Sequence, residues 1–126
     1  MNGSQKYYND NGDNMIKGIG CDLVNLERIK KSDIMKLAKR ILTEREFIMF
    51  SDSSNEKRKI EFLAGRFAAK EAYSKALGFG IGQVGFKDIE ILNDEAGKPV
   101  INSDNSVHIS ITHTDEYAMA FAVVEK

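Results

Sequence analysis

The ten residues from Arg66 to Lys75 combine cationic, acidic and hydroxyl side chains at the spacing of a helix. Arg66, Lys70 and Ser74 lie four positions apart and would form one row, with Glu71 and Lys75 in the neighbouring row. A carboxylate with cationic side chains above and below it suits a metal ion together with an anion. A set of exposed ion pairs would show the same spacing, so both interpretations remain open at this point.

Asp22 is a second candidate, on a predicted strand over residues 16–24. Apolar residues at positions 19, 21 and 23 alternate there with Gly18, Gly20 and Asp22, which is the two-residue period of a strand. The two glycines would let another segment approach that face closely. On this pattern Cys21 belongs to the apolar face and is expected to be a small buried residue.

A third motif, Gly80 to Gly85, matches the G-x-G-x-x-G pattern of dinucleotide-binding proteins. That pattern requires a strand before it and a helix after it, because the helix N-terminus holds the pyrophosphate. Here the predicted helix comes first. We therefore expect a flexible loop beside an active site rather than a dinucleotide site.

Helices that would position these residues are expected within about 27–40, from Thr43 through Phe50, and over roughly 56–77. Capping-box patterns at Thr43–Glu46 and Ser53–Glu56 mark two of the starts, and Gly78 marks the end of the longest helix. One early strand, then helices, then a run of antiparallel strands predict an α+β domain. The later strands are expected at 89–92, 100–101, 107–113 and 117–124, the last one central because it is apolar on both faces.

The composition is that of one ordinary globular domain, with 126 residues, 42% hydrophobic and 29% charged. We expect this domain to span residues 15–126, with residues 1–14 as a disordered leader or a cloning remnant. No long apolar run or signal peptide is visible, which predicts a cytoplasmic protein, and the single Cys21 excludes an internal disulfide.

The net charge of −1 argues against general nucleic-acid binding, yet the cations are clustered. Residues 28–40 carry six positive side chains against one negative, and residues 57–75 hold a second, more mixed cluster. Such clusters suggest an anionic ligand, an acidic partner, or both.

Three blocks of this sequence together resemble the signatures of bacterial holo-acyl-carrier-protein synthases, the short trimeric class of the 4′-phosphopantetheinyl transferase superfamily. They match in order and spacing, and the resemblance runs from about residue 15 to the C-terminus. The blocks are Ile19-Gly20-Cys21-Asp22-Leu23-Val24, Phe67-Ala68-Ala69-Lys70-Glu71-Ala72-Tyr73-Ser74-Lys75 and Ile109-Ser110-Ile111-Thr112-His113-Thr114.

The resemblance implies the phosphopantetheinyl transferase fold and transfer of 4′-phosphopantetheine from coenzyme A to a serine of apo acyl carrier protein. This reaction releases adenosine 3′,5′-bisphosphate and serves fatty acid biosynthesis. The resemblance also implies three catalytic residues. Asp22 and Glu71 would bind Mg²⁺, and Lys75 would contact the pyrophosphate. The serine proton would pass to Glu71 or to a metal-bound water.

By the same resemblance, the nucleotide phosphates of coenzyme A would be bound by Lys57, Arg58, Arg66, Lys75 and His113. From its position alone, at the end of a strand, His113 could equally be structural. An acidic carrier protein would contact the basic segment, with candidate residues Arg28, Lys36, Lys39 and Arg40.

Val24 stands where the larger, monomeric transferases carry a second acid, which matches the short class with active sites at the interfaces of a homotrimer. Three alternatives remain open from the sequence. The first is a non-catalytic module that binds anions or nucleic acids, the second is a transferase for a secondary-metabolism carrier, and the third is a structural oligomer.

Overall fold

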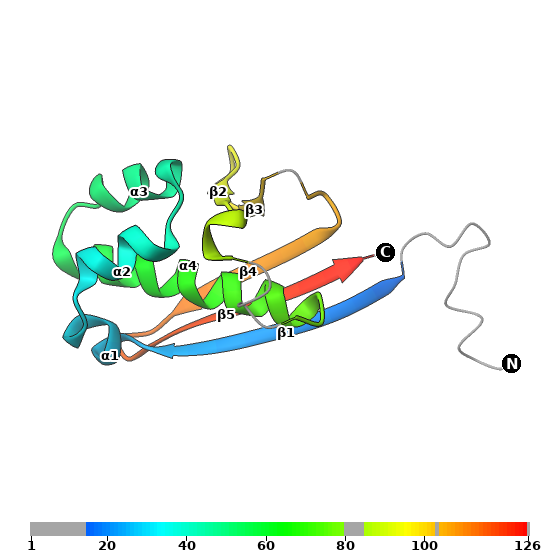
Figure 1. The fold of residues 1–126 in the computed structure, drawn as a ribbon, viewed down its shortest axis with the longest axis horizontal. Coiled ribbons are helices and arrows are strands. Elements are labelled where there is room, and N and C mark those ends of the chain that lie inside the picture. Colours follow the sequence, from blue (N-terminus) through cyan, green and yellow to red (C-terminus); the bar gives the residue numbers. More distant parts are fainter. Residues whose placement is uncertain (1–14, 80–84, 103, 126) are drawn as a thin grey trace, which may run out of the picture.

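The computed structural model describes residues 15–79, 85–102 and 104–125. The expected leader at 1–14 and most of the glycine loop, 80–84, lie outside the described residues. The fold is α+β as predicted, with one long helix lying along a three-stranded antiparallel sheet (Figure 1). The sheet has the order β1-β5-β4, and a separate two-stranded sheet pairs β2 with β3. The bounds of the strands are β1 Ile16–Asn25, β2 Ile91–Asn93, β3 Pro99–Ile101, β4 Val107–His113 and β5 Tyr117–Glu125.

The basic segment forms two helices, α1 (Leu26–Lys31) and α2 (Ile34–Ile41), so the prediction of one helix over 27–40 was wrong. Ser32 ends α1, where its hydroxyl donates to the carbonyl of Ile29 at 2.6 Å. Asp33 then begins α2 by accepting from the backbone N–H of Lys36 at 3.1 Å. Short polar side chains that bond to nearby backbone favour such breaks over continuous helix.

The next two helices confirm the capping signals in part. In α3 (Glu44–Ser51), Thr43 and Glu46 form the predicted capping box. The long helix α4 (Glu56–Ala76) begins after Asn55, which accepts from Arg58 N–H at 2.9 Å, rather than at the Ser53 pattern. Its end is followed by Gly78 at φ +88°, a left-handed conformation that glycine adopts without strain.

The later strands follow the alternation closely. β4 has the predicted bounds, and β5 is the central strand of its sheet, as expected from its two apolar faces. The strand expected at 89–92 begins later, as β2, after a 3₁₀ turn η2 (Phe86–Asp88). The η2 turn, which leads into the small sheet, packs near α2.

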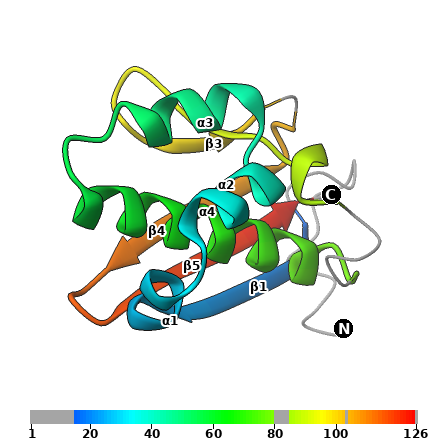
Figure 2. The ribbon, with the colours of Figure 1, turned by 60° about the vertical axis from the view of Figure 1, so that its left-hand side comes forward.

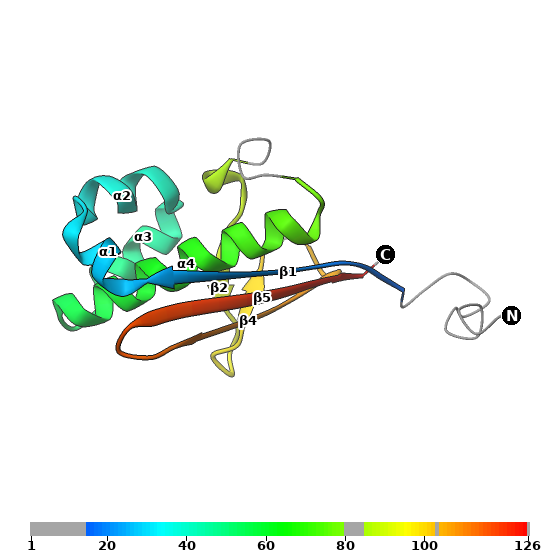
Figure 3. The same cartoon turned by 90° about the horizontal axis from the view of Figure 1, so that it is seen from below.

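Helices α1 to α4 gather on one side of the three-stranded sheet (Figures 2 and 3). The core lies between α4 and the sheet, where Ala118, Ala120 and Ala122 of β5 are fully or almost fully buried. No helix among the described residues is long and apolar enough to cross a membrane.

The opposite face of the sheet carries exposed apolar side chains, so the predicted burial of Cys21 was wrong. Cys21 is exposed beside Ile19 and Leu23, which are 59% and 61% exposed. The glycine face of β1 packs on α4 instead, because bare backbone allows the strand to approach the helix more closely than large side chains would. We call the exposed side chains at positions 19, 21, 23, 117, 119 and 121 the outer face.

Candidate active site

The candidate site begins where β1 crosses α4. A Cβ atom added at Gly20 would collide with the carbonyl oxygen of Ala72, and one at Gly18 with that of Ala76. Two residues of a strand advance by about 6.6 Å and four residues of a helix by about 6 Å, so the two glycines match successive helix turns. The next residue of β1 that faces α4 is Asp22. In this register it lies farther toward the N-terminal end of α4 than Gly20 does.

Asp22 meets Lys75 at this crossing. The Nζ atom of Lys75 lies 3.2 Å from Oδ1 of Asp22 and donates to the carbonyl oxygen of Cys21 at 3.1 Å. The Asp22 side chain is 19% exposed and that of Lys75 is 54% exposed, so the pair is open to a ligand from solvent. Lys75 therefore forms its ion pair with Asp22 on β1.

Glu71 completes the group from the turn of α4 beside Lys75. Its partial burial raises the pKa of the Glu71 carboxyl, the negative charge of Asp22 raises this pKa further, and Lys75 opposes both effects. The charges of the two predicted metal ligands therefore oppose each other. A divalent cation would relieve that repulsion, and two carboxylates are the oxygen donors that Mg²⁺ takes from proteins.

No group of three or more His, Cys, Asp or Glu side chains able to hold a metal occurs within residues 15–79, 85–102 and 104–125. A metal held at Asp22 and Glu71 would thus draw its other ligands from substrate and water.

The neighbouring row of α4 is buried, so the interpretation as exposed ion pairs was wrong for it. Lys70 and Ser74 are 0% and 1% exposed, and Arg66 is 6% exposed. The ammonium of Lys70 forms a buried ion pair with Glu46 at 2.6 Å. Burial lowers the pKa of Lys70, an effect that the charge of Glu46 opposes.

Arg66 faces the small sheet. Its guanidinium donates to Oδ1 of Asn93 on β2 at 3.2 Å and lies 4.5 Å from the ring centre of Phe62. The buried Nε finds no hydrogen-bond partner among the described residues. Burial lowers the pKa of Arg66, and the negative charge of Glu46 opposes this shift. Arg66 therefore points toward β2, whereas Lys75 lies toward β1.

The other predicted phosphate ligands meet at the N-terminal end of α4. Glu61 joins two of them, since it lies 3.7 Å from Nη1 of Arg58 and 3.5 Å from Nε2 of His113. Lys57 forms an ion pair with Asp115 at 3.4 Å. All three of these predicted ligands border one pocket of about 520 Å³, lined by Asn55, Lys57, Arg58, Glu61, His113, Thr114 and Asp115. The structure thus brings Lys57, Arg58 and His113 together.

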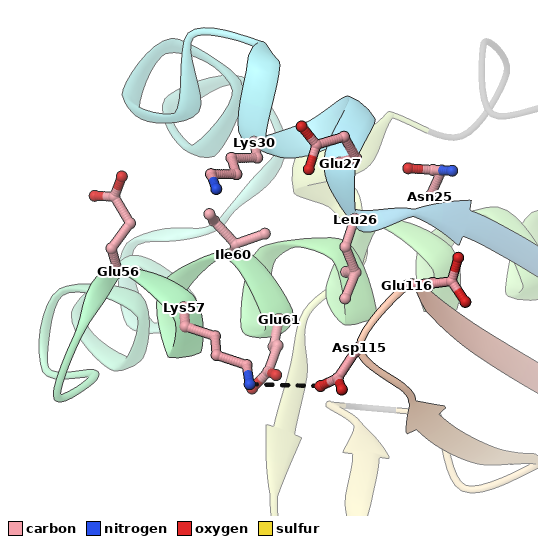
Figure 4. A pocket seen from close by; sticks show the side chains of 10 residues that line it. All are labelled: Asn25, Leu26, Glu27, Lys30, Glu56, Lys57, Ile60, Glu61, Asp115 and Glu116. Atoms are coloured by element: carbon pink, nitrogen blue, oxygen red, sulfur yellow. Dashed lines mark hydrogen bonds and ion pairs between the residues drawn. The ribbon is translucent and has the colours of Figure 1, made fainter.

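A larger pocket of about 800 Å³ adjoins this group, between α1, the start of α4 and the turn after β4 (Figure 4). Leu26 and Ile60 give it apolar walls, and Glu61, Lys57 and Asp115 are common to both pockets. Glu61 was not among the predicted site residues. Its one local signal is the three-residue spacing from Arg58 on a helix, which an ordinary surface ion pair would also show.

The four candidate carrier contacts are exposed on two separate helices. Arg28 lies on α1, while Lys36, Lys39 and Arg40 lie on α2. Arg40 also lies over the ring of Phe86, 5.8 Å from its centre. The cationic surface is therefore anchored at the end of α2 to the η2 turn.

Comparison with known proteins now supplies the family. The profile of the 4′-phosphopantetheinyl transferase superfamily matches residues 18–122, so the chain belongs to this superfamily of enzymes. It is 55% identical over 116 residues to a holo-[acyl-carrier-protein] synthase of Staphylococcus aureus strain JH9, covering 89% of this chain and 98% of that protein. A protein of the same name from Staphylococcus haemolyticus is 55% identical over 117 residues, with the same shares of both chains covered.

Solved structures agree with the sequence relatives. A holo-(acyl-carrier-protein) synthase from Bacillus anthracis in complex with CoA (3′,5′-ADP) has a TM-score of 0.82 at 49% identity, with 89% of this chain and 98% of that chain covered. The Helicobacter pylori synthase in complex with coenzyme A has a TM-score of 0.72 at 35% identity, covering 86% and 99%. The transferase fold expected from the three sequence blocks is confirmed.

Proposed function

We propose that this protein transfers the 4′-phosphopantetheine group of coenzyme A to a serine hydroxyl of apo acyl carrier protein, for fatty acid biosynthesis. The family and the names of its relatives support the reaction. The structural observation that carries the proposal is the ion pair of Asp22 on β1 with Lys75 on α4, one helical turn after Glu71.

Asp22 and Glu71 would hold a Mg²⁺ ion, since the two carboxylates interact and are partly open to solvent. Such an ion supplies Lewis-acid stabilisation of phosphate oxygens. Lys75 would place its positive charge on the pyrophosphate and would exchange part of its contact with Asp22 for this ligand.

In the reaction, the serine oxygen of the carrier bonds to the β-phosphorus of coenzyme A. The bond from that phosphorus to the bridging oxygen breaks, and adenosine 3′,5′-bisphosphate leaves with the electron pair. The serine proton passes to a base, which is either Glu71 or a water molecule at the site. The protein mainly positions the two substrates and stabilises the growing negative charge of the leaving group.

We propose that one coenzyme A is bound between two copies of the chain in a homotrimer. Lys57 and Lys75 are 18 positions apart on α4, which corresponds to about 27 Å along a helix. Arg66 faces a different side of α4 from Lys75. The phosphate ligands of one chain thus diverge, and a neighbouring chain could complete each site. The outer face offers a suitable apolar surface for this assembly.

An acidic carrier protein would dock on the cations of α1 and α2, because opposite charge speeds association and fixes orientation. Arg28, Lys36, Lys39 and Arg40 are exposed there. The proposed acceptor is the carrier of fatty acid synthesis. A polyketide or peptide synthetase carrier domain is the competing acceptor.

The decisive experiment incubates the protein with coenzyme A, Mg²⁺ and apo carrier protein, and then measures the mass of the carrier. We expect a gain of one phosphopantetheine, lost on addition of chelator and in Glu71→Gln. A Glu95→Gln variant, in the exposed turn before β3, should behave as wild type. An unchanged carrier mass with the wild type would overturn the proposal, and faster labelling of a synthetase carrier domain would favour the competing acceptor.

A further inference from the structure

A fully buried ion pair includes Lys70, the residue that precedes Glu71 on α4. Lys70 and Glu46 both have 0% side-chain exposure, and Nζ of Lys70 lies 2.6 Å from Oε1 of Glu46. The same ammonium donates to the carbonyl oxygens of Ile41 at 2.6 Å and Phe86 at 3.0 Å. All three N–H groups of this lysine therefore have acceptors, one from each of three separate segments.

Glu46 extends the network to two further places. Its Oε1 accepts from the backbone N–H of Thr43 at 2.8 Å, and its Oε2 accepts from that of Ile91 at 2.7 Å. One lysine and one glutamate therefore join α4 to the end of α2, the start of α3, the η2 turn and the first residue of β2.

The segments joined in this way are those to which the proposed function assigns different tasks. Lys70 directly precedes Glu71 on α4 and lies one turn before Ser74, whose neighbour is Lys75. Ile41 is the last residue of α2, the helix that carries Lys36, Lys39 and Arg40. Arg40 also contacts Phe86, the residue whose carbonyl accepts from Lys70.

Stability alone gives little reason to bury such a pair. Removing two charges from water carries a large desolvation cost, and apolar residues of similar volume often replace buried ion pairs without loss of stability. What a charged pair adds is fixed geometry, because each of its hydrogen bonds is satisfied in only one arrangement of the surrounding segments.

We infer that Lys70 and Glu46 are positioning residues for the transfer reaction, which hold the carrier-binding helix α2 in fixed register with Glu71 and Lys75. The inference rests on the proposed function. In this role the pair orients the bound carrier relative to the phosphate of coenzyme A. Other residues bind coenzyme A itself.

The test is a double-mutant cycle between this pair and the carrier-binding surface. The variant E46Q/K70M removes both charges and approximates the original volumes, so no charge stays buried without a partner. The backbone carbonyls of Ile41 and Phe86 lose their donor, so we expect the variant to melt below the wild type while still folding. It should bind coenzyme A with Mg²⁺ within about two-fold by calorimetry, while kcat/KM for the carrier falls at least about 10-fold.

The second arm adds Lys36→Glu, on exposed α2, to both backgrounds. In wild type this charge reversal lowers kcat/KM for the carrier. In E46Q/K70M its effect should shrink, because α2 no longer holds the carrier in one orientation, and contacts that share a network are non-additive. Lys98→Glu, in the exposed turn before β3, is the control and should change kcat/KM for the carrier little in either background.

Additive effects, or a fall in carrier kcat/KM no larger than the loss of coenzyme A affinity, would overturn the inference. If E46Q/K70M does not fold, Lys70→Arg takes its place, since it keeps the charge but alters the fit to the three acceptors. It should lower carrier kcat/KM with coenzyme A affinity unchanged, and an unchanged kcat/KM would again refute the inference. A wild type without any transfer would instead overturn the proposed function itself.

Discussion

The amine of Lys75 lies 3.2 Å from the carboxylate of Asp22, although 53 positions separate these residues in the chain. The contact exists because Gly18 and Gly20 let β1 lie directly on the helix that carries Lys75. It places one positive charge beside two carboxylates, Asp22 and Glu71, that would otherwise repel each other.

Mg²⁺ should raise the melting temperature of the wild type, and this rise should disappear in Asp22→Asn and Glu71→Gln. A ligand that binds only the folded state stabilises it in proportion to the logarithm of its concentration. In chelator, Glu71→Gln should melt at or above the wild type, because the folded state disfavours the ionised Glu71. Thermal melts with and without Mg²⁺ check this, with Glu95→Gln as the control. An undiminished Mg²⁺ response in both variants would refute the metal site.

Lys75→Met should lower kcat for transfer by about 10²- to 10³-fold, since it removes a cation aimed at developing phosphate charge. The loss should exceed any loss of coenzyme A affinity, as expected for an interaction that strengthens in the transition state. Steady-state kinetics and calorimetry together measure the two effects. Lys98→Met is the matched control, and equal losses in kcat and affinity would argue against this role for Lys75.

Gly20→Ala should destabilise the protein by roughly 1–3 kcal/mol or more, because its Cβ would collide with the backbone of α4 rather than with a flexible side chain. The displaced strand should also weaken the Mg²⁺-dependent rise in melting temperature. Denaturant unfolding with and without Mg²⁺ tests both effects. Lys17→Ala, at an exposed position of the same strand, should leave both nearly unchanged. A wild-type stability for Gly20→Ala would show that β1 and α4 are farther apart at Gly20 than a methyl group requires.

Glu90 gives a prediction about pH. The pKa of its carboxyl is lowered by the hydrogen bond from Thr43, with further contributions from Arg45 and Asn102, against the opposing effect of burial. A carboxyl with a lowered folded-state pKa stabilises the protein above its unfolded pKa of about 4.5, and this stabilisation is lost as the pH falls through the folded pKa.

Glu90→Gln should therefore melt below the wild type at neutral pH, and the difference should shrink as the pH falls below 4.5. Melting curves over a pH series measure it, beside Glu95→Gln as the control. A difference that stays constant down to low pH would mean that Glu90 acts through packing rather than through its charge.

The outer face predicts the oligomeric state. Leu23 is 61% exposed in a single chain, and Leu23→Glu puts a charge on the apolar outer face. It should therefore convert the proposed trimer to monomer and reduce activity with it. Ile48→Glu, an equally drastic change at a residue 57% exposed on α3, should leave the trimer intact. Sedimentation equilibrium distinguishes the outcomes. A wild type that is monomeric at working concentration would refute the trimer.

Signals that act over a few residues predicted much of this fold. The capping box of Thr43 and Glu46, the stop at Gly78 and the alternation of β4 all depend on neighbouring positions, and the structure contains them. Asp22 and Glu71 are 49 positions apart, so their pairing needed the family resemblance. The geometry at the crossing then supports it.

The errors arose where distant residues decide the environment. Lys70 looked like a surface cation because its acceptors at Ile41, Glu46 and Phe86 come from other segments. Cys21 was assigned to the core because apolar residues usually face inward, whereas here the glycines do. The break at Ser32 was missed because the apolar stripe of the basic segment continues across both helices.

The register between β1 and α4 also limits which insertions and deletions the chain can accept. One residue inserted between Gly20 and Asp22 would reverse the facing of everything beyond it, because successive strand residues point to opposite sides. Asp22 would then lie on the outer face and Leu23 would press against the helix. The length of this strand segment is therefore as restricted as its residue types, and only changes by two residues would keep the carboxylate on the side of Lys75.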